Sequence, residues 1–206
     1  MPEYFIGVDL GQTNDYTAIA VLERERSEKR SSNTYLVRHL DRLQRGTPYP
    51  QQVERVSEVL DRVERSQRHS DDASSPRLVV DQTGVGRPVV DMLRQAGHDG
   101  LTAVTITAGD TPSREGRDYR VPKRELVSVL QVLLQTDRLG IVSSLQHAET
   151  LTRELLAFKV KISAAGNDTY GNDWRENPHD DMVLAVALAT WAGENERSHN
   201  FAFVGG

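Results

Sequence analysis

Residues 4–23 read YFIGVDLGQTNDYTAIAVLE. The runs YFIGVDL and TAIAVLE are β-rich, and the polar, glycine-bearing stretch between them is typical of a turn. The segment therefore predicts a β-hairpin at the start of the chain. Asp9 interrupts the first run, and a carboxylate at the end of a buried strand costs free energy unless something positive neutralises it. The partner of Asp9 is the first functional question that the sequence raises.

Beyond this hairpin the pattern predicts a third strand and then helices alternating with strands. The expected elements are a strand at 34–40, a helix at 50–68, a strand at 77–81, a helix at 89–97, a strand at 101–107, a surface loop at 109–121, a helix at 123–136 that begins after Pro122, a helix at 144–160 and a buried helix at 177–195. Three consecutive strands followed by helices and further strands indicate an α/β fold. No repeat or linker divides the chain, so one domain over 1–206 is expected.

The composition limits the possible functions. There is no cysteine, which excludes disulfides, thiolate zinc sites and a cysteine nucleophile, and which fits a reducing cytoplasm. No apolar run approaches the roughly 20 residues that cross a bilayer, so no membrane partner is expected. The formal net charge is −5, so any site for a polyanion has to be a local basic patch.

Four aspartates occupy positions that open α/β sheets use for their sites. Asp9 ends the first strand, Asp81 ends the apolar strand RLVVD, and Asp180 with Asp181 opens the last helix. Ligands usually bind at the edge where such strands end. If the last helix packs across the sheet, all four carboxylates approach one edge.

Each of these aspartates also has a local explanation. Asp9 fits a turn or cap, and Asp81 before Gln-Thr-Gly fits an Asx turn. Asn177 fits a helix N-cap followed by Pro178, and acids in the first turn of a helix complement its dipole. None of the four is decisive alone.

Together, the carboxylates predict a metal site. Three or four of them at one edge would repel each other unless cations neutralised them, and oxygen ligands select Mg²⁺ or Mn²⁺. Two such ions, about 4 Å apart, support phosphodiester hydrolysis. Asp9 would bridge both ions, Asp81 would hold one, and the pair Asp180 and Asp181 would hold the other.

Three segments carry a resemblance to a known family. "IGVDLGQTNDYTAIAVLE", "LVVDQTGVGRPVVDMLR" and "ENPHDDMVLAVALATW" resemble, in the right order, the three motifs of the nuclease domain of the phage terminase large subunit. The resemblance extends from residue 4 to about 192. It implies an RNase H-like fold, in which a mixed central sheet of three antiparallel strands and then parallel strands is flanked by helices.

The resemblance also implies an activity and its residues. The chain is expected to be an Mg²⁺- or Mn²⁺-dependent endonuclease that cuts double-stranded, concatemeric viral DNA during genome packaging, in the cytoplasm of a bacterial host. The implied metal ligands are Asp9, Asp81 and the HDD segment, where Asp181 is favoured over Asp180 and His179 is a possible auxiliary residue. The chain has no GxxxxGK[ST] phosphate loop, so packaging would need a separate ATPase motor domain, a small terminase subunit and a portal.

Other functions remain open from the sequence. GVDLGQTN also resembles the first phosphate loop of actin-like ATPases, although those proteins need a second such lobe. A Holliday-junction resolvase would share the fold and the acids, and a degenerate domain would bind DNA without cutting it. TGVGRP at 83–88 fits either a phosphate-binding turn or, preferentially, a tight strand-to-helix turn.

DNA contacts must come from local positive charge, made mainly to phosphates. The candidates are Arg114, Arg117, Arg120, Lys123, Arg124, Lys159 and Lys161. Residues 164–175 resemble a hairpin flap near the nuclease site, or form a surface loop.

Overall fold

The computed structural model describes residues 2–11, 15–26, 32–67, 74–84, 86–164 and 180–201, and the side chains of the last two ranges as far as residues 157 and 195. The strands are β1 (Glu3–Asp9), β2 (Ala18–Arg26), β3 (Asn33–Arg42), β4 (Arg77–Asp81), β5 (Thr102–Thr107), β6 (Ser113–Glu115), β7 (Asp118–Pro122) and β8 (Leu139–Ile141). The helices are α1 (Tyr49–Gln67), α2 (Gly86–Gln95), α3 (Lys123–Gln135), α4 (Ala148–Ala164) and α5 (Asp181–Phe201).

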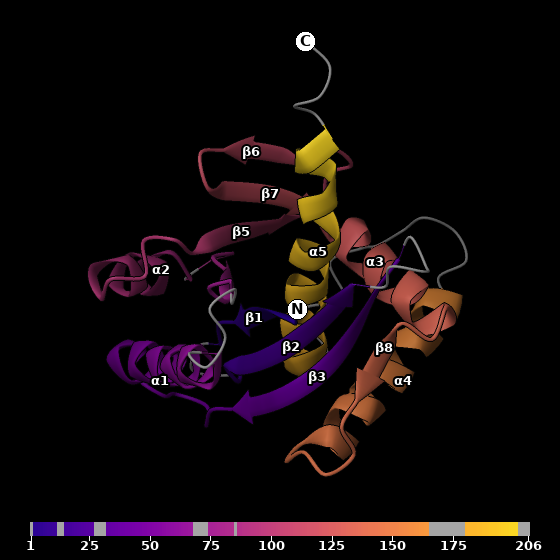
Figure 1. Cartoon of the computed structure of the whole chain (residues 1–206), viewed down its shortest axis with the longest axis horizontal. Coiled ribbons are helices and arrows are strands. Elements are labelled where there is room, and N and C mark those ends of the chain that lie inside the picture. The colour runs from indigo at the N-terminus through magenta and orange to yellow at the C-terminus, as the bar shows by residue number, and fades with distance from the viewer. Residues whose placement is uncertain are drawn as a thin grey trace.

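The strands form one mixed sheet in the order β6-β7-β5-β4-β1-β2-β3-β8 (Figure 1). β1, β2 and β3 are antiparallel neighbours, whereas β4 pairs with β1 in parallel and β5 pairs in parallel with both β4 and β7. The carboxyl ends of β1 and β4 therefore lie side by side at one edge of the sheet.

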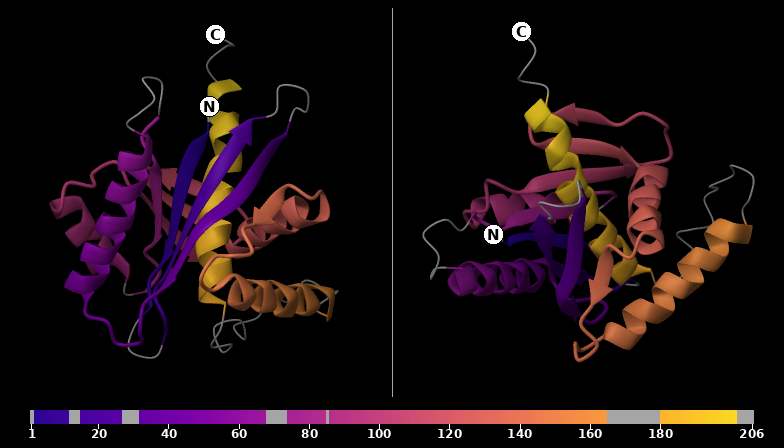
Figure 2. Two further views of the ribbon diagram at one scale, coloured as in Figure 1. Left: turned by 60° about the horizontal axis from the view of Figure 1, so that its bottom comes forward. Right: turned by 45° about the vertical axis from the view of Figure 1, so that its right-hand side comes forward.

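Helices cover both faces of this sheet (Figure 2). On one face, α1 and α2 pack their valines and leucines against Ile6, Val8 and Val80. On the other face, α3, α4 and α5 form the larger core with Phe5 and Val79. Successive residues of a strand point to opposite faces, so the odd-numbered positions of β1 and β4 face α5.

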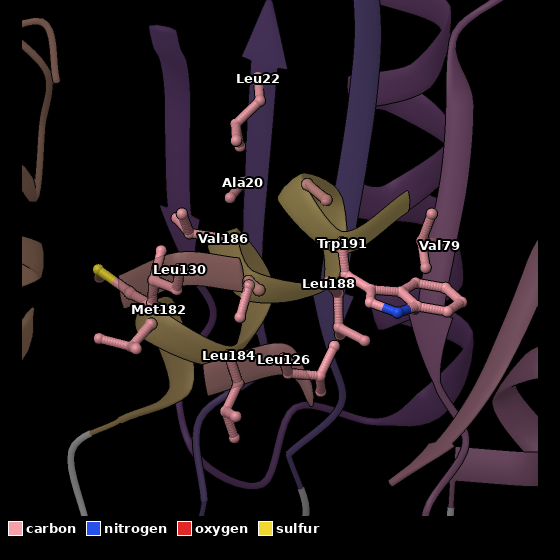
Figure 3. Close-up of a cluster of buried hydrophobic side chains, with 14 of the residues drawn as sticks. Ala20, Leu22, Val79, Leu126, Leu130, Met182, Leu184, Val186, Leu188 and Trp191 are labelled. Carbon is pink, nitrogen blue, oxygen red and sulfur yellow. The ribbon is translucent and has the colours of Figure 1, made fainter. Parts of the chain in front are cut away.

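The helix α5 is apolar on nearly all sides, because it is buried between the sheet and α3. Figure 3 shows Met182, Leu184, Val186 and Leu188 pointing outward from it in different directions into the core. Its backbone lies directly on β1: a Cβ added to Gly7 would overlap the carbonyl oxygen of Ala185 and lie 3.0 Å from the amide nitrogen of Ala189. Gly7 therefore sets how closely α5 approaches the sheet.

The expected fold class and the three leading antiparallel strands are confirmed. The prediction of a loop at 109–121 is wrong, because β6 and β7 form an antiparallel hairpin there. β8 has only three residues and was not predicted. The last helix begins at Asp181 rather than near residue 177, and the expected N-cap Asn177 lies outside the described residues. No helix in the described part of the chain is long and apolar enough to cross a membrane.

Candidate functional site

Asp9 and Asp81 are neighbours at the carboxyl edge of the sheet. β1 and β4 pair in parallel register up to Val8 and Val80, and the two aspartates are the next residues of their strands. Both share the face of Gly7 and Val79, which is the face that α5 covers. Neighbouring strands are about 4.8 Å apart, so the two carboxylates start from adjacent backbones and point the same way.

The row of paired residues that contains Asp9 continues across the sheet to the guanidinium group of Arg42. Asp9 pairs with Ala18 of β2, and Ala18 pairs with Arg42, the last residue of β3. Paired residues of neighbouring strands point to the same face. Asp81, Asp9, Ala18 and Arg42 therefore stand in line, and the small Ala18 leaves room between the acids and the guanidinium.

The first turn of α5 lies over this row. Asp181 lies one helical turn before Ala185. The carbonyl group of Ala185 contacts Gly7, and Gly7 precedes Asp9 by two residues in β1. Nη2 of Arg42 donates to Oδ2 of Asp181 at 2.7 Å. The carbonyl oxygen of Asp180 accepts the amide hydrogen of Leu184 at 2.9 Å and so begins the helical hydrogen bonding.

The electrostatics of Asp9 reflect this convergence. Burial raises the pKa of Asp9 well above its ordinary value, and the carboxylates of Asp81, Asp181, Asp180 and Asp15 raise it further. Within the described part of the chain, no positive group is among the causes that set the pKa of Asp9, so the sequence's question about its partner stays open.

Asp81 combines its place in the cluster with a local turn. Its Oδ1 accepts hydrogen bonds from the backbone N–H and the hydroxyl group of Thr83, at 2.7 and 2.5 Å. The Thr83 hydroxyl also accepts the amide hydrogen of Ile106 at 2.8 Å, which ties the end of β4 to β5. The expected Asx turn is present, and it orients the Asp81 carboxylate.

Sequence reasoning missed Glu154 and Arg42. Glu154 of α4 is 6% exposed, and its Oε2 accepts the amide hydrogen of Met182 at 3.2 Å. Its Oε1 lies 3.5 Å from Nη2 of Arg42 without a hydrogen bond. Burial raises the pKa of Glu154 to about 7 and Asp181 adds to this shift, although Arg42 opposes it.

A sequence signal existed for Glu154, since it stands one residue before Leu155 and three after Leu151 on the apolar face of its helix. Arg42 had no comparable signal, because the predicted strand stopped at residue 40. Its guanidinium also lies 4.0 Å from the centre of the Tyr16 ring, which holds it in place.

No three His, Asp or Glu side chains in the described part of the chain stand close enough together to hold a metal ion as they are oriented. The carboxylate of Asp181 is turned toward Arg42. The donor set nevertheless fits a divalent cation in kind, because it consists of oxygen ligands whose mutual repulsion only positive charge relieves. His179, the expected auxiliary residue, and residues 165–175 of the expected flap lie outside the described part.

The basic residues predicted for DNA lie in different surroundings. Arg120 lines a hollow beside Gln82, and Arg114 and Arg117 line another with Arg26 and Arg77 on the α5 side. Arg124 is paired with Asp110 at 2.8 Å, and Lys123 is only 8% exposed. Lys159 and Lys161 belong to α4, but their side chains are not among those described.

Gly84 has a φ of 68°, which accounts for one glycine of TGVGRP as a turn residue. A Cβ on Gly86 would lie 2.5 Å from the carbonyl oxygen of Asp81. Both glycines are thus required by the tight passage from β4 to α2, as expected.

Comparison with known proteins identifies the family. The family model of the terminase RNase H-like domain matches residues 6–192. The terminase large subunits of Thermus phage G20c and Thermus virus P23-45 are each 24% identical over 201 residues, which is 96% of this chain and 33% of theirs. The chain thus spans about a third of the length of these relatives.

Solved structures agree with the fold. The large terminase nuclease of phage G20c superposes with a TM-score of 0.52 at 20% identity, covering 91% of this chain and 81% of that one. The nuclease domain of the g2p large terminase of bacteriophage SPP1, with bound Mn, gives 0.52 at 14% identity, covering 95% and 86%. The Mn-soaked, inhibitor-bound nuclease domain of the human cytomegalovirus terminase gives 0.55 at 11% identity, covering 95% and 85%. Because the family model matches residues 6–192, the chain belongs to the terminase RNase H-like domain family.

Proposed function

We propose that this chain is an Mg²⁺- or Mn²⁺-dependent endonuclease that hydrolyses phosphodiester bonds of double-stranded DNA. The observation that carries the proposal is the convergence of carboxylates at the end of β1. Asp9 and Asp81 follow directly on the paired residues Val8 and Val80, and the charges of Asp81, Asp181 and Asp180 help to raise the pKa of the partly buried Asp9. A site that repels its own charges at the carboxyl edge of a sheet is suited to binding cations.

We propose two ions, which the carboxylates of Asp9, Asp81, Asp180 and Asp181 would hold. When bound, the ions would activate water for attack and stabilise the leaving oxygen. The SPP1 and cytomegalovirus nuclease structures, which share this fold, were determined with Mn. His179 is retained as a possible auxiliary residue.

The side chains of this protein have distinct proposed roles. Thr83 holds the Asp81 carboxylate in one orientation. Arg42 holds Oδ2 of Asp181, and its charge limits repulsion between Asp181 and Glu154. Glu154 fixes the start of α5 through the amide group of Met182.

The proposed setting is genome packaging in a bacterial host cell, with the chain acting as a single RNase H-like nuclease domain over residues 1–206. It would act in the cytoplasm, cut concatemeric viral DNA and work with an ATPase motor domain, a small terminase subunit and a portal. The relatives from the Thermus phages are terminase large subunits about three times as long as the matched segment, which supports this setting.

The decisive experiment follows supercoiled plasmid during incubation with Mn²⁺, Mg²⁺ or EDTA. We expect nicking and linearisation with the metal ions, none with EDTA, and loss of cutting in Asp9→Asn. The matched control is Asp61→Asn on the exposed side of α1, which should cut like the wild type.

Two results would contradict the proposal: cutting by Asp9→Asn in Mn²⁺ after careful purification, or equal loss of cutting in both variants. A comparison of four-way junctions with linear duplex tests the alternative resolvase function. Cleavage restricted to the junction would favour the resolvase over the terminase nuclease.

A further inference from the structure

A positively charged hollow lies beside the sheet edge that carries Asp9 and Asp81, on the face of the sheet that α2 covers. It is a hollow of about 410 Å³ lined by Gln82, Arg87, Thr105, Ser113, Arg114, Glu115, Asp118, Tyr119 and Arg120. Gln82 directly follows Asp81, and its side-chain amide donates to Oγ1 of Thr105 at 3.2 Å. One wall of the hollow therefore begins next to a proposed metal ligand.

Two arginines in this hollow are exposed and are candidates for binding a ligand. Arg87, in the first turn of α2, and Arg120, in β7, are both exposed, and within the described part of the chain neither makes a hydrogen bond or an ion pair. The arginines of the hollow on the α5 side are engaged instead: Arg26 pairs with Glu3, and Arg117 donates to the carbonyl oxygen of Asp99.

The side chains that line the hollow carry a net positive charge. Asp118 is neutralised by Arg94 of α2, whose Nη2 lies 2.6 Å from its Oδ1. Glu115 is the remaining acidic side chain of the lining, and one carboxylate cannot neutralise both Arg87 and Arg120. In a chain with a formal net charge of −5, such a local excess of positive charge attracts an anion.

The register places Arg120 at a useful distance from the acids. Asp81 pairs with Val104 of β5, and the next residue, Thr105, pairs with Arg120 of β7. Two strand spacings separate β4 from β7, which is about 10 Å. Phosphates of one DNA strand advance about 3.4 Å per nucleotide along the helix axis. A duplex whose axis runs from β4 toward β7 would therefore bring a phosphate roughly three nucleotides from the cut bond to Arg120.

On the basis of the proposed nuclease function, we infer that Arg87 and Arg120 form a binding site for a backbone phosphate of the DNA substrate, about three nucleotides from the bond that is cut. The guanidinium groups bind phosphate oxygens by paired N–H donors. A duplex lying across the carboxyl edge of the sheet contacts the acids on one face and the two arginines on the other. This site reads the backbone and carries no base preference.

The test compares Arg87→Ala/Arg120→Ala with a matched double variant, Arg62→Ala/Arg65→Ala, whose arginines are exposed on α1. Binding of a labelled duplex is measured by fluorescence anisotropy in Ca²⁺ over a range of salt concentrations. Loss of two phosphate contacts should weaken binding at about 0.1 M salt on the order of 50-fold and reduce the slope of log K against log salt by about 1.8. The control variant should bind like the wild type, and Arg87→Lys/Arg120→Lys should keep most of the salt dependence.

A second readout separates this site from the acid cluster. Hydrolysis of bis(p-nitrophenyl) phosphate in Mn²⁺ needs no flanking phosphate, so the Arg87→Ala/Arg120→Ala variant should retain the wild-type rate. The inference is overturned if this variant binds duplex as tightly as the wild type, if it loses hydrolysis of the small diester, or if the wild type does not bind duplex. Failure of the proposed nuclease function looks different, since the wild type would then bind DNA but cleave neither substrate in Mn²⁺.

Discussion

Asp9 and Arg42 lie in one row of the sheet and are an acidic and a basic residue, yet they do not neutralise each other. Burial and the surrounding carboxylates raise the pKa of Asp9, whereas Arg42 neutralises Asp181 and lies near Glu154. Ala18 lies between them in the row, and the guanidinium of Arg42 pairs with Asp181 at the start of α5. The proposed metal ions would then neutralise Asp9 at the end of β1.

Replacing Arg42 by Met should destabilise the metal-free protein. The change leaves Asp181 and Glu154 buried without their cation, and breaking a buried ion pair from one side costs about 3 kcal/mol or more. Urea denaturation at pH 8 measures the loss. Arg62→Met on the exposed face of α1 serves as the control and should change the free energy of unfolding by less than about 0.5 kcal/mol. Equal stability of the two variants would show that Arg42 does not neutralise the buried acids.

The raised pKa of Glu154 predicts how the free energy of unfolding of the metal-free protein depends on pH. Its pKa is about 7 in the folded protein, compared with 4.5 for an exposed glutamate, so the folded state holds the proton more tightly. Stability is therefore greatest below about pH 4.5 as far as this group is concerned, and it falls between pH 4.5 and 7, by about 3 kcal/mol. Asp9, whose pKa is also raised, contributes in the same direction.

Urea denaturation at several pH values between 5 and 8, in EDTA, tests this dependence. Glu154→Gln should flatten much of the slope, because an amide does not titrate. A slope unchanged by this substitution would place the responsible groups elsewhere.

At the scale of elements, the site depends on how closely α5 approaches β1. Gly7 lacks a side chain, so the backbone of α5 rests on the strand and the first turn of the helix reaches the row of Asp9 and Asp81. Glu154 of α4 then accepts the amide hydrogen of Met182, and Arg42 of β3 binds Asp181. Three elements besides α5 thus determine where its acidic end lies.

Substitution of Gly7 by Ala should be costly. The new methyl group would overlap the carbonyl oxygen of Ala185, a backbone atom that moves only with the helix, so we expect a destabilisation of about 3 kcal/mol. Guanidinium denaturation checks this value. In Gly100→Ala the new Cβ would meet no described atom within 4 Å, so that control should be nearly neutral. A neutral Gly7→Ala would mean that α5 does not rest on β1.

At the scale of the whole molecule, the proposed metal binding should be coupled to folding. The folded chain gathers carboxylates that are dispersed in the unfolded chain, so the ions should bind the folded state preferentially. At a metal concentration 100 times the dissociation constant, the stabilisation is about 2.7 kcal/mol.

Thermal unfolding with and without Mn²⁺ measures this coupling. Asp9→Asn should be at least as stable as the wild type in EDTA, because it removes a repelled charge, and it should lose most of the shift caused by Mn²⁺. Asp61→Asn should behave like the wild type under both conditions. A full Mn²⁺ shift in Asp9→Asn would place the ions elsewhere.

Local patterns were sufficient for much of this protein. The apolar run before Asp81 identified β4 with its correct bounds, and the spacing of valines identified α1 within a residue at each end. The sequence of the β6–β7 hairpin resembles that of a loop, because its residues are mostly polar and exposed and no alternation marks the strands. β8 cannot be predicted from the sequence, because three residues are too few to show a strand pattern.

The sequence by itself determined the fold class and which acids stand at the ends of strands, because strand periodicity and apolar burial are properties of short segments. Only the tertiary structure decided that Arg42 and Glu154 join these acids and that Arg87 and Arg120 share a hollow beside them. Such associations depend on sheet register and on the approach of α5 to Gly7. They are relations between distant residues that no local pattern encodes.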